Sequence, residues 1–104
     1  MKVYKYIYDP AADVIYMEFV KKREGKHLYG DIDLFDIVLY YDEKHKLVGM
    51  EHLEFIKDYE KGEIKRELKM LLPKLRWRDI VKIYKKVKSG IKKDRRKWFN
   101  IFWW

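Results

Sequence analysis

Several amino-acid types are missing or scarce in this sequence, which has no Cys, no Thr, no Gln, one Ser and one Asn. The lack of cysteine excludes disulfides, zinc–thiolate sites and cysteine nucleophiles. Ser89 would have to serve any hydroxyl triad alone, yet it precedes Gly90 among lysines, where the end of a helix is the better interpretation. We therefore expect no enzyme, no catalytic residues, no metal site and no cofactor.

Long apolar segments are missing as well. No run approaches the roughly 20 apolar residues that cross a bilayer, and the first residues lead into no signal-like segment. We expect a cytoplasmic protein without a membrane role. Few thermolabile amides together with many Lys and Glu indicate a hyperthermophilic source.

The chain length of 104 residues predicts one domain, 1–104, and excludes a two-domain enzyme. With 48% hydrophobic and 17% aromatic residues, the chain is too apolar to be a disordered tail. Charge is divided unevenly, because residues 1–60 hold 9 Lys and Arg against 13 Asp and Glu, whereas residues 61–104 hold 16 against 4. We divide the domain into a β-sheet half, 2–56, and a basic helical half, 59–104.

The first half shows the alternation of strands. Apolar and aromatic residues alternate over 3–8, and Asp9 to Asp13 has the composition of a turn. Further strands are predicted at 14–20, 27–32, 35–41 and 47–55, with Ile15, Met17 and Phe19 on one face of the second. Apolar residues on both faces of the last two predict a sheet covered by helices on one side and by a second subunit on the other.

The second half shows the spacing of helices. Apolar residues at i, i+4, i+7 and i+8 from Ile64 predict a helix that stops before Pro73, and the pattern resumes at Trp77. This second helix ends at Gly90 in one interpretation. In the other it continues as a coiled-coil seam, because aromatic and apolar residues recur every seven positions at Trp77, Tyr84, Ile91 and Trp98. The fold class we predict is α+β, an antiparallel sheet of four or five strands followed by two or three C-terminal helices.

Two segments of the first half resemble a known family. Residues 8–17, YDPAADVIYM, and residues 38–51, VLYYDEKHKLVGME, are similar to the opening segment and the closing hairpin of the family catalogued as domain of unknown function 2283. In this chain His45 occupies a turn position usually given to Gly. The resemblance implies a small, mainly β domain of bacteria and archaea with no established catalytic residues and an antitoxin-type role. It does not extend to residues 61–104.

Three groups of residues raise the question of chemistry, and each has a structural alternative. Asp31, Asp33 and Asp36 lack the spacing of a calcium loop and fit a solvated strand edge. Strand alternation places His52 and Glu54 on one face, as an acid/base pair if they are buried or as a surface ion pair. The stripe Tyr4, Tyr6 and Tyr8 fits core packing, or base stacking if exposed. His27 and His45 complete the histidines, and His45 is expected in an exposed turn.

The most distinctive segment is the C-terminal tail. Cations come first and apolar residues follow, which is not the segregation around a helix axis that an interfacial membrane helix shows. Several exposed indoles would form an aggregation-prone patch, so we expect the tail to be buried in the same chain, across a dimer or in a protein partner. The predicted partner-binding residues are Trp98, Phe99, Phe102, Trp103 and Trp104.

Our functional hypothesis is a non-enzymatic interaction module, dimeric and possessing aromatic anchors inside a basic surround. The alternative is a nucleic-acid-binding protein, since phosphate neutralisation requires a dense set of cations. The residues that would serve it are Lys85, Lys86, Lys92, Lys93, Arg95, Arg96 and Lys97.

Overall fold

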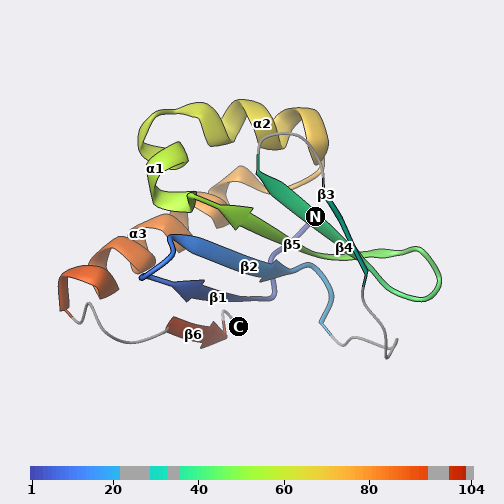
Figure 1. Ribbon diagram of the computed structural model, residues 1–104, viewed down its shortest axis with the longest axis horizontal. Helices are drawn as coiled ribbons and strands as arrows, with labels where there is room; N and C mark the ends of the chain where they lie inside the picture. The colour runs from blue at the N-terminus through green and yellow to red at the C-terminus, as the bar shows by residue number, and fades with distance from the viewer. Residues whose placement is uncertain (22–28, 33–35, 94–98, 103–104) are drawn as a thin grey trace.

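An antiparallel sheet with helices against one face forms the molecule, and the predicted α+β class is confirmed (Figure 1). The computed structural model describes residues 1–21, 29–32, 36–93 and 99–102, with side chains for 1–21 and 36–90. The described strands are β1 (Lys5–Asp9), β2 (Val14–Glu18), β3 (Tyr29–Ile32), β4 (Ile37–Tyr41), β5 (Leu47–Leu53) and β6 (Phe99–Phe102). The described helices are α1 (Phe55–Glu60), α2 (Glu63–Leu71) and α3 (Trp77–Lys93).

The strand order is β3-β4-β5-β2-β1-β6, and every neighbouring pair is antiparallel. All five strands predicted from the first half are present. The sixth, β6, comes from the C-terminal tail and pairs with β1 in the register Lys5 to Phe102 and Tyr8 to Phe99. The basic half is therefore not helical to its end.

Neither interpretation of the long helix was correct. Helix α3 passes Gly90 and ends at Lys93, so Gly90 does not terminate it, and residues 99–102 form a strand where the coiled-coil seam required a helix. A glycine costs a helix about 1 kcal/mol, which a helix with a buried face tolerates. The tail pairs with β1 because an open sheet edge presents unpaired N–H and C=O groups that a further strand satisfies.

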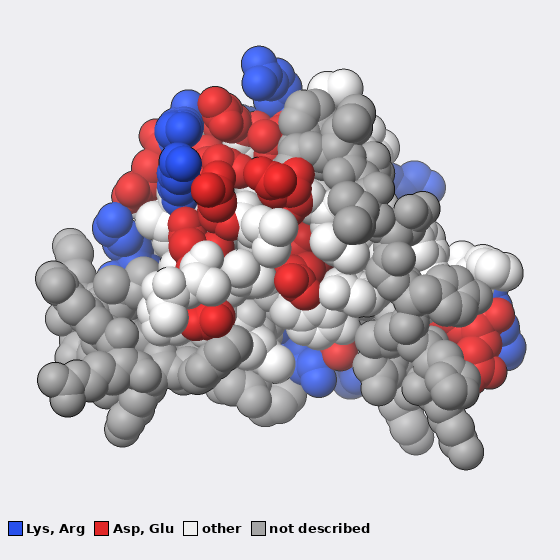
Figure 2. Space-filling model, viewed as in Figure 1, with Lys and Arg blue, Asp and Glu red and all other residues white. Residues whose placement is uncertain are grey.

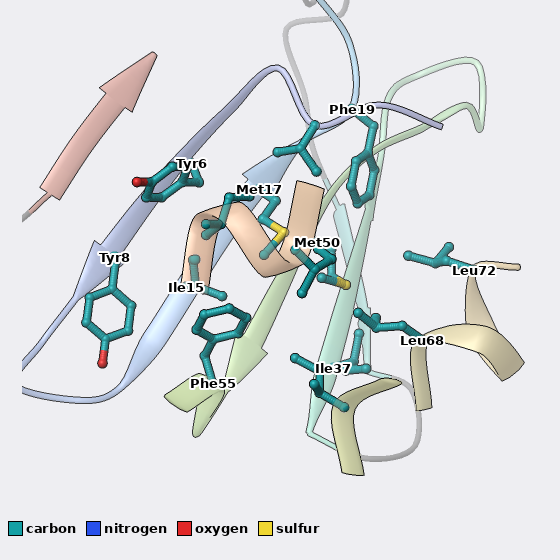
Figure 3. Close-up of a cluster of buried hydrophobic side chains, with 14 of the residues drawn as sticks. Tyr6, Tyr8, Ile15, Met17, Phe19, Ile37, Met50, Phe55, Leu68 and Leu72 are labelled. Carbon is teal, nitrogen blue, oxygen red and sulfur yellow. The ribbon is translucent and has the colours of Figure 1, made fainter. Parts of the chain in front are cut away.

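The core lies between the sheet and the helices (Figure 3). The sheet contributes alternate residues, and the expected inward face of the second strand is confirmed because Ile15, Met17 and Phe19 are buried. Tyr6 and Tyr8 are also buried, which favours core packing over base stacking for these two tyrosines. From α3 the core receives residues at helical spacing, namely Ile80, Ile83 and Val87.

The aromatic residues Trp77 and Tyr84, which had suggested a coiled-coil seam, lie against α1. The ring of Tyr59 stacks on Tyr84 at a centroid distance of 3.8 Å and on Trp77 at 5.8 Å. Their seven-residue spacing places them two turns apart on one side of α3, where Tyr59 fits between them. The seven-residue spacing of Trp77 and Tyr84 therefore reflects packing within one chain.

One aspartate in the β1–β2 turn fixes the start of α1. Glu54 alone separates β5 from α1, and it adopts a left-handed conformation with φ of 57° and makes no capping hydrogen bond with its side chain. The carboxylate of Asp13 accepts hydrogen bonds from the backbone N–H groups of Ile56 at 2.8 Å and Lys57 at 3.1 Å. Its backbone carbonyl accepts from the N–H of Phe55 at 2.9 Å. Asp13 thus satisfies the first N–H groups of a helix that begins 42 residues later.

We expect Asp13→Ala to lower the free energy of unfolding by about 2 to 3 kcal/mol. The substitution removes a helix cap and the acceptor of the Tyr8 hydroxyl, and it places alanine at a φ of 54°. Asp13→Asn is the matched control, because asparagine tolerates the left-handed conformation and keeps one carbonyl acceptor. Urea denaturation of both variants measures the difference, and equal losses in the two would contradict the capping role.

Candidate functional sites: a buried histidine–carboxylate cluster and a basic helix stripe

His52 lies on the core face of β5, and none of its surface is exposed. The predicted pairing with Glu54 is wrong in both of its forms. Glu54 is exposed and forms an ion pair with Lys57 at 3.5 Å, because the left-handed turn that starts α1 breaks the strand alternation after Leu53. The partners of His52 come from the helices instead.

Two carboxylates face the imidazole of His52. Its Nε2 atom lies 3.4 Å from Oε2 of Glu67 and 3.8 Å from Oδ2 of Asp58. Its Nδ1 atom lies 2.7 Å from the carbonyl oxygen of Leu53. A carbonyl oxygen only accepts hydrogen bonds, so Nδ1 carries a hydrogen, and Nε2 is the atom directed at the carboxylates. We call His52, Asp58 and Glu67 the His52 cluster.

The two carboxylates reach His52 because each occupies an inward position of its helix. Asp58 follows the buried Phe55 by three residues in α1, and Glu67 lies between the buried Ile64 and Leu68 in the inner stripe of α2. A charged residue at an apolar position of a helical repeat was the signal in the sequence. It marks a buried charge without revealing its partner, since the partner lies on another element.

Burial raises the pKa of both carboxyl groups of the cluster. For Asp58, desolvation is the main cause, His52 opposes it, and the neighbouring carboxylates of Glu54, Glu63 and Asp36 raise the pKa further. For Glu67, desolvation again raises the pKa, while the hydrogen bond and charge of His52 lower it. In both groups burial outweighs the opposing effect of His52.

The surface around the cluster is acidic. Figure 2 shows that Asp and Glu side chains gather over α1 and the start of α2, with some Lys or Arg side chains among them. The side chains of Asp58 and Glu67 keep 9% and 6% of their surface exposed, so the cluster touches solvent at this acidic patch. A mobile cation would be drawn to it.

The opposite charge dominates the exposed side of α3. Arg78, Lys82, Lys85 and Lys86 are all exposed and recur at i, i+4, i+7 and i+8, so they line one side of the helix opposite the buried residues of the core. We call these four residues the α3 stripe. In the part of the chain that the structure describes, no carboxylate lies within ion-pair distance of Arg78 or Lys85.

Most carboxylates of residues 61–90 lie inside the fold. Residues 61–90 contain three of them, and two are buried, Glu67 in the His52 cluster and Asp79 beside Val3, which precedes β1. The Asp79 carboxylate accepts a hydrogen bond from the backbone N–H of Val3 at 3.1 Å. The described Lys and Arg side chains of residues 61–90 are exposed, apart from the half-buried Lys88.

Lys88 joins α3 to the end of α1. Its Nζ atom donates to the Glu60 carboxylate at 2.8 Å, and the Tyr84 hydroxyl donates to the same oxygen at 2.6 Å. The hydrogen bonds from Lys88 and Tyr84 lower the pKa of Glu60. The hydrogen bond from Tyr84 to Glu60, together with burial, raises the pKa of Tyr84 to about 12.

The remaining sequence candidates divide into described and undescribed residues. His45 is exposed at a φ of 61°, which confirms its place in a turn and accounts for a position that favours glycine. Asp36 is exposed, whereas Asp31 belongs to the edge strand β3 and its side chain lies outside the described residues. The side chains of the partner-binding set, Trp98, Phe99, Phe102, Trp103 and Trp104, lie outside the described residues. The same is true of His27, Asp33, Lys92, Lys93, Arg95, Arg96 and Lys97.

The sheet face opposite the core carries tyrosines bonded to glutamates. The hydroxyl of Tyr16 donates to Glu18 at 3.2 Å, and that of Tyr40 donates to Glu51 at 2.9 Å. A shallow hollow of about 450 Å³ lies on this face, lined by Ile7, Asp9, Val14, Tyr16 and Glu51. Helices cover the other face as predicted, and cover of this face by a second subunit stays a prediction.

Comparison of the chain with protein-family models, with curated proteins and with solved structures finds no match. The resemblance to the family of domain of unknown function 2283 therefore stays a prediction. Among the described helices, none has the length and apolar character needed to traverse a bilayer.

We expect the stabilising effect of Glu60 to depend on pH. Because its pKa is lower in the folded state than in the unfolded state, its contribution is present above the unfolded pKa, about 4.3, and is lost as the pH falls through the folded pKa. Glu60→Gln should lower the melting temperature slightly at pH 7 and have a smaller effect near pH 3. Thermal unfolding at both pH values tests this, and a difference that does not change with pH would contradict it.

Proposed function

We propose that the protein is a non-enzymatic interaction module that binds nucleic acid through the α3 stripe. One observation carries the proposal, namely that the helical segment turns cations outward and carboxylates inward. Net charge alone would not distinguish a binding surface from ion pairs within the fold. The burial of Glu67 and Asp79 supports the proposal, because these two carboxylates are withdrawn from the exposed surface of the helical segment.

The dimensions of the α3 stripe suit a phosphate backbone. From Arg78 to Lys86 the helix rises about 12 Å, a distance over which one strand of a duplex presents three to four phosphates. Contacts of this kind position a protein on nucleic acid without reading its sequence. The further cations at Lys92, Lys93, Arg95, Arg96 and Lys97 follow in the same segment and add to the expected electrostatic attraction.

A protein partner, bound by the aromatic tail, is the second candidate. The pairing of β6 with β1 supports this candidate, because it places residues 99–102 of the tail at the edge of the sheet. Trp103 and Trp104 follow β6 directly in the sequence. An antitoxin-type complex or a homo-oligomer would use the same residues. The tail and the α3 stripe can be tested separately.

We expect Lys82→Glu combined with Lys85→Glu to weaken duplex binding at least tenfold. If about six phosphates are neutralised, the wild-type protein should show a slope of log affinity against log salt of about −5, and loss of two contacts should reduce its magnitude by about 2. Fluorescence anisotropy with a labelled duplex at several salt concentrations measures both quantities.

The matched control is Lys44→Glu combined with Lys46→Glu. These lysines are exposed in the β4–β5 turn, and the double substitution changes the net charge by the same amount. Affinity should fall much less in this variant. Equal losses in the two double variants would contradict a defined binding stripe, and the lack of wild-type binding at low salt would contradict nucleic-acid binding altogether.

For the protein-partner candidate, we expect Trp103→Ala combined with Trp104→Ala to reduce partner capture from nuclease-treated extract while duplex binding is unchanged. Truncation at residue 91 would be less informative, because it removes β6 and opens the edge of β1. Mass spectrometry of the co-purified material identifies the partner. Unaltered capture by the double variant would exclude the two terminal tryptophans as anchors.

A further inference from the structure

The His52 cluster gathers three metal-ligating side chains from three separate elements. His52 comes from β5, Asp58 from α1 and Glu67 from α2, and one donor atom of each lies within 4.8 Å of the other two. All three residues are buried. The arrangement joins the sheet to both helices at a point where polar groups are otherwise costly.

The separations in the cluster are longer than those of strong charge-assisted hydrogen bonds and are close to those between the ligands of one ion. A charge-assisted N–H···O bond is about 2.7 to 2.9 Å long, whereas Nε2 of His52 lies 3.4 and 3.8 Å from the two carboxylate oxygens. Ligand atoms bound tetrahedrally to zinc at about 2.0 to 2.2 Å lie about 3.3 to 3.6 Å from one another. Small side-chain shifts would bring all three atoms onto one ion.

The orientation of the imidazole is that of a metal ligand. The Nδ1–H group of His52 donates to the carbonyl oxygen of Leu53 at 2.7 Å, which directs Nε2 at the carboxylates. Metal-bound histidines almost always donate their other ring N–H in this way, and the hydrogen bond fixes both the tautomer and the ring orientation. Contact of the Phe55 ring with the imidazole, at a centroid distance of 6.2 Å, restricts the ring further.

The composition of the cluster suits a cation. Among the described residues, the groups that act on Asp58 and Glu67 are His52 and other carboxylates, with no lysine or arginine. One imidazole thus faces two buried carboxylates, and Asp36, Glu54 and Glu63 add negative charge near Asp58. A bound divalent cation would compensate it.

We propose that His52, Asp58 and Glu67 form a binding site for Zn²⁺ that fixes α1 and α2 to the sheet. One imidazole nitrogen with two carboxylates suits zinc, whereas Ca²⁺ and Mg²⁺ take oxygen ligands in larger numbers. The second oxygen of one carboxylate or a water molecule completes the tetrahedron. The site is structural, and it is independent of nucleic-acid binding by the α3 stripe.

The test uses the full chain in a His27→Ala and His45→Ala background, which leaves His52 as the sole histidine. After treatment with a chelator, Zn²⁺ alone is titrated by calorimetry and thermal unfolding is followed with and without it. We expect one ion per chain, a higher melting temperature with Zn²⁺, and reversal by the chelator. Co²⁺ in place of Zn²⁺ should give the visible absorption of a tetrahedral complex.

Two isosteric substitutions separate the metal site from a metal-free ion network. Asp58→Asn and Glu67→Gln should each weaken Zn²⁺ binding at least about tenfold. Neither should lower the metal-free melting temperature, because each removes uncompensated buried charge, and circular dichroism verifies the fold. Unchanged affinity in both variants would overturn the proposal. So would the absence of Zn²⁺ binding, or of the Co²⁺ absorption, in the histidine-reduced protein.

Discussion

The hydrogen bonds of Asp13 to the start of α1 are the constraint on which the helical layer depends. A single residue, Glu54, connects β5 to α1, so the chain has no loop in which to adjust the direction of the helix. From the β1–β2 turn, Asp13 sets that direction by accepting hydrogen bonds from the backbone N–H groups of Phe55, Ile56 and Lys57. Without this cap the first turn of α1 would leave its donors unsatisfied.

The direction of α1 in turn decides where charge lies. Asp58 of α1 thereby faces His52. Gly62, in a left-handed conformation, then starts α2, whose inner face carries Glu67 to the same histidine. Asp58 and Glu67 are buried, while the described lysines and arginines of α2 and α3 are exposed apart from Lys88. The resulting molecule has an acidic patch over α1 and a basic stripe along α3, and the two binding proposals depend on these separate surfaces.

The parts of the fold that depend on local alternation and helical spacing were predictable from the sequence. The alternation around Ile15, Met17 and Phe19 and the helical spacing from Ile64 and Trp77 each correspond to an element of the structure. The tail was not predictable in this way, because residues 99–102 become a strand through pairing with β1, far away in the sequence. The seven-residue repeat led to a wrong prediction of a coiled coil for a similar reason. Trp77 and Tyr84 pack against the single residue Tyr59 of the short helix α1, and not along a coiled-coil partner.

Of the candidate sites, the α3 stripe was largely visible in the sequence and the His52 cluster was not. Lysines on the solvated side of an amphipathic helix follow from its period, and Lys85 and Lys86 lie where that period places them. The cluster joins residues 52, 58 and 67 of three elements, and no spacing encodes their meeting. By itself the sequence determined which residues avoid water and which remain in it, because that depends on local composition and period. Only the tertiary structure decided which buried charges meet, because that depends on the angle at which the helices cross the sheet.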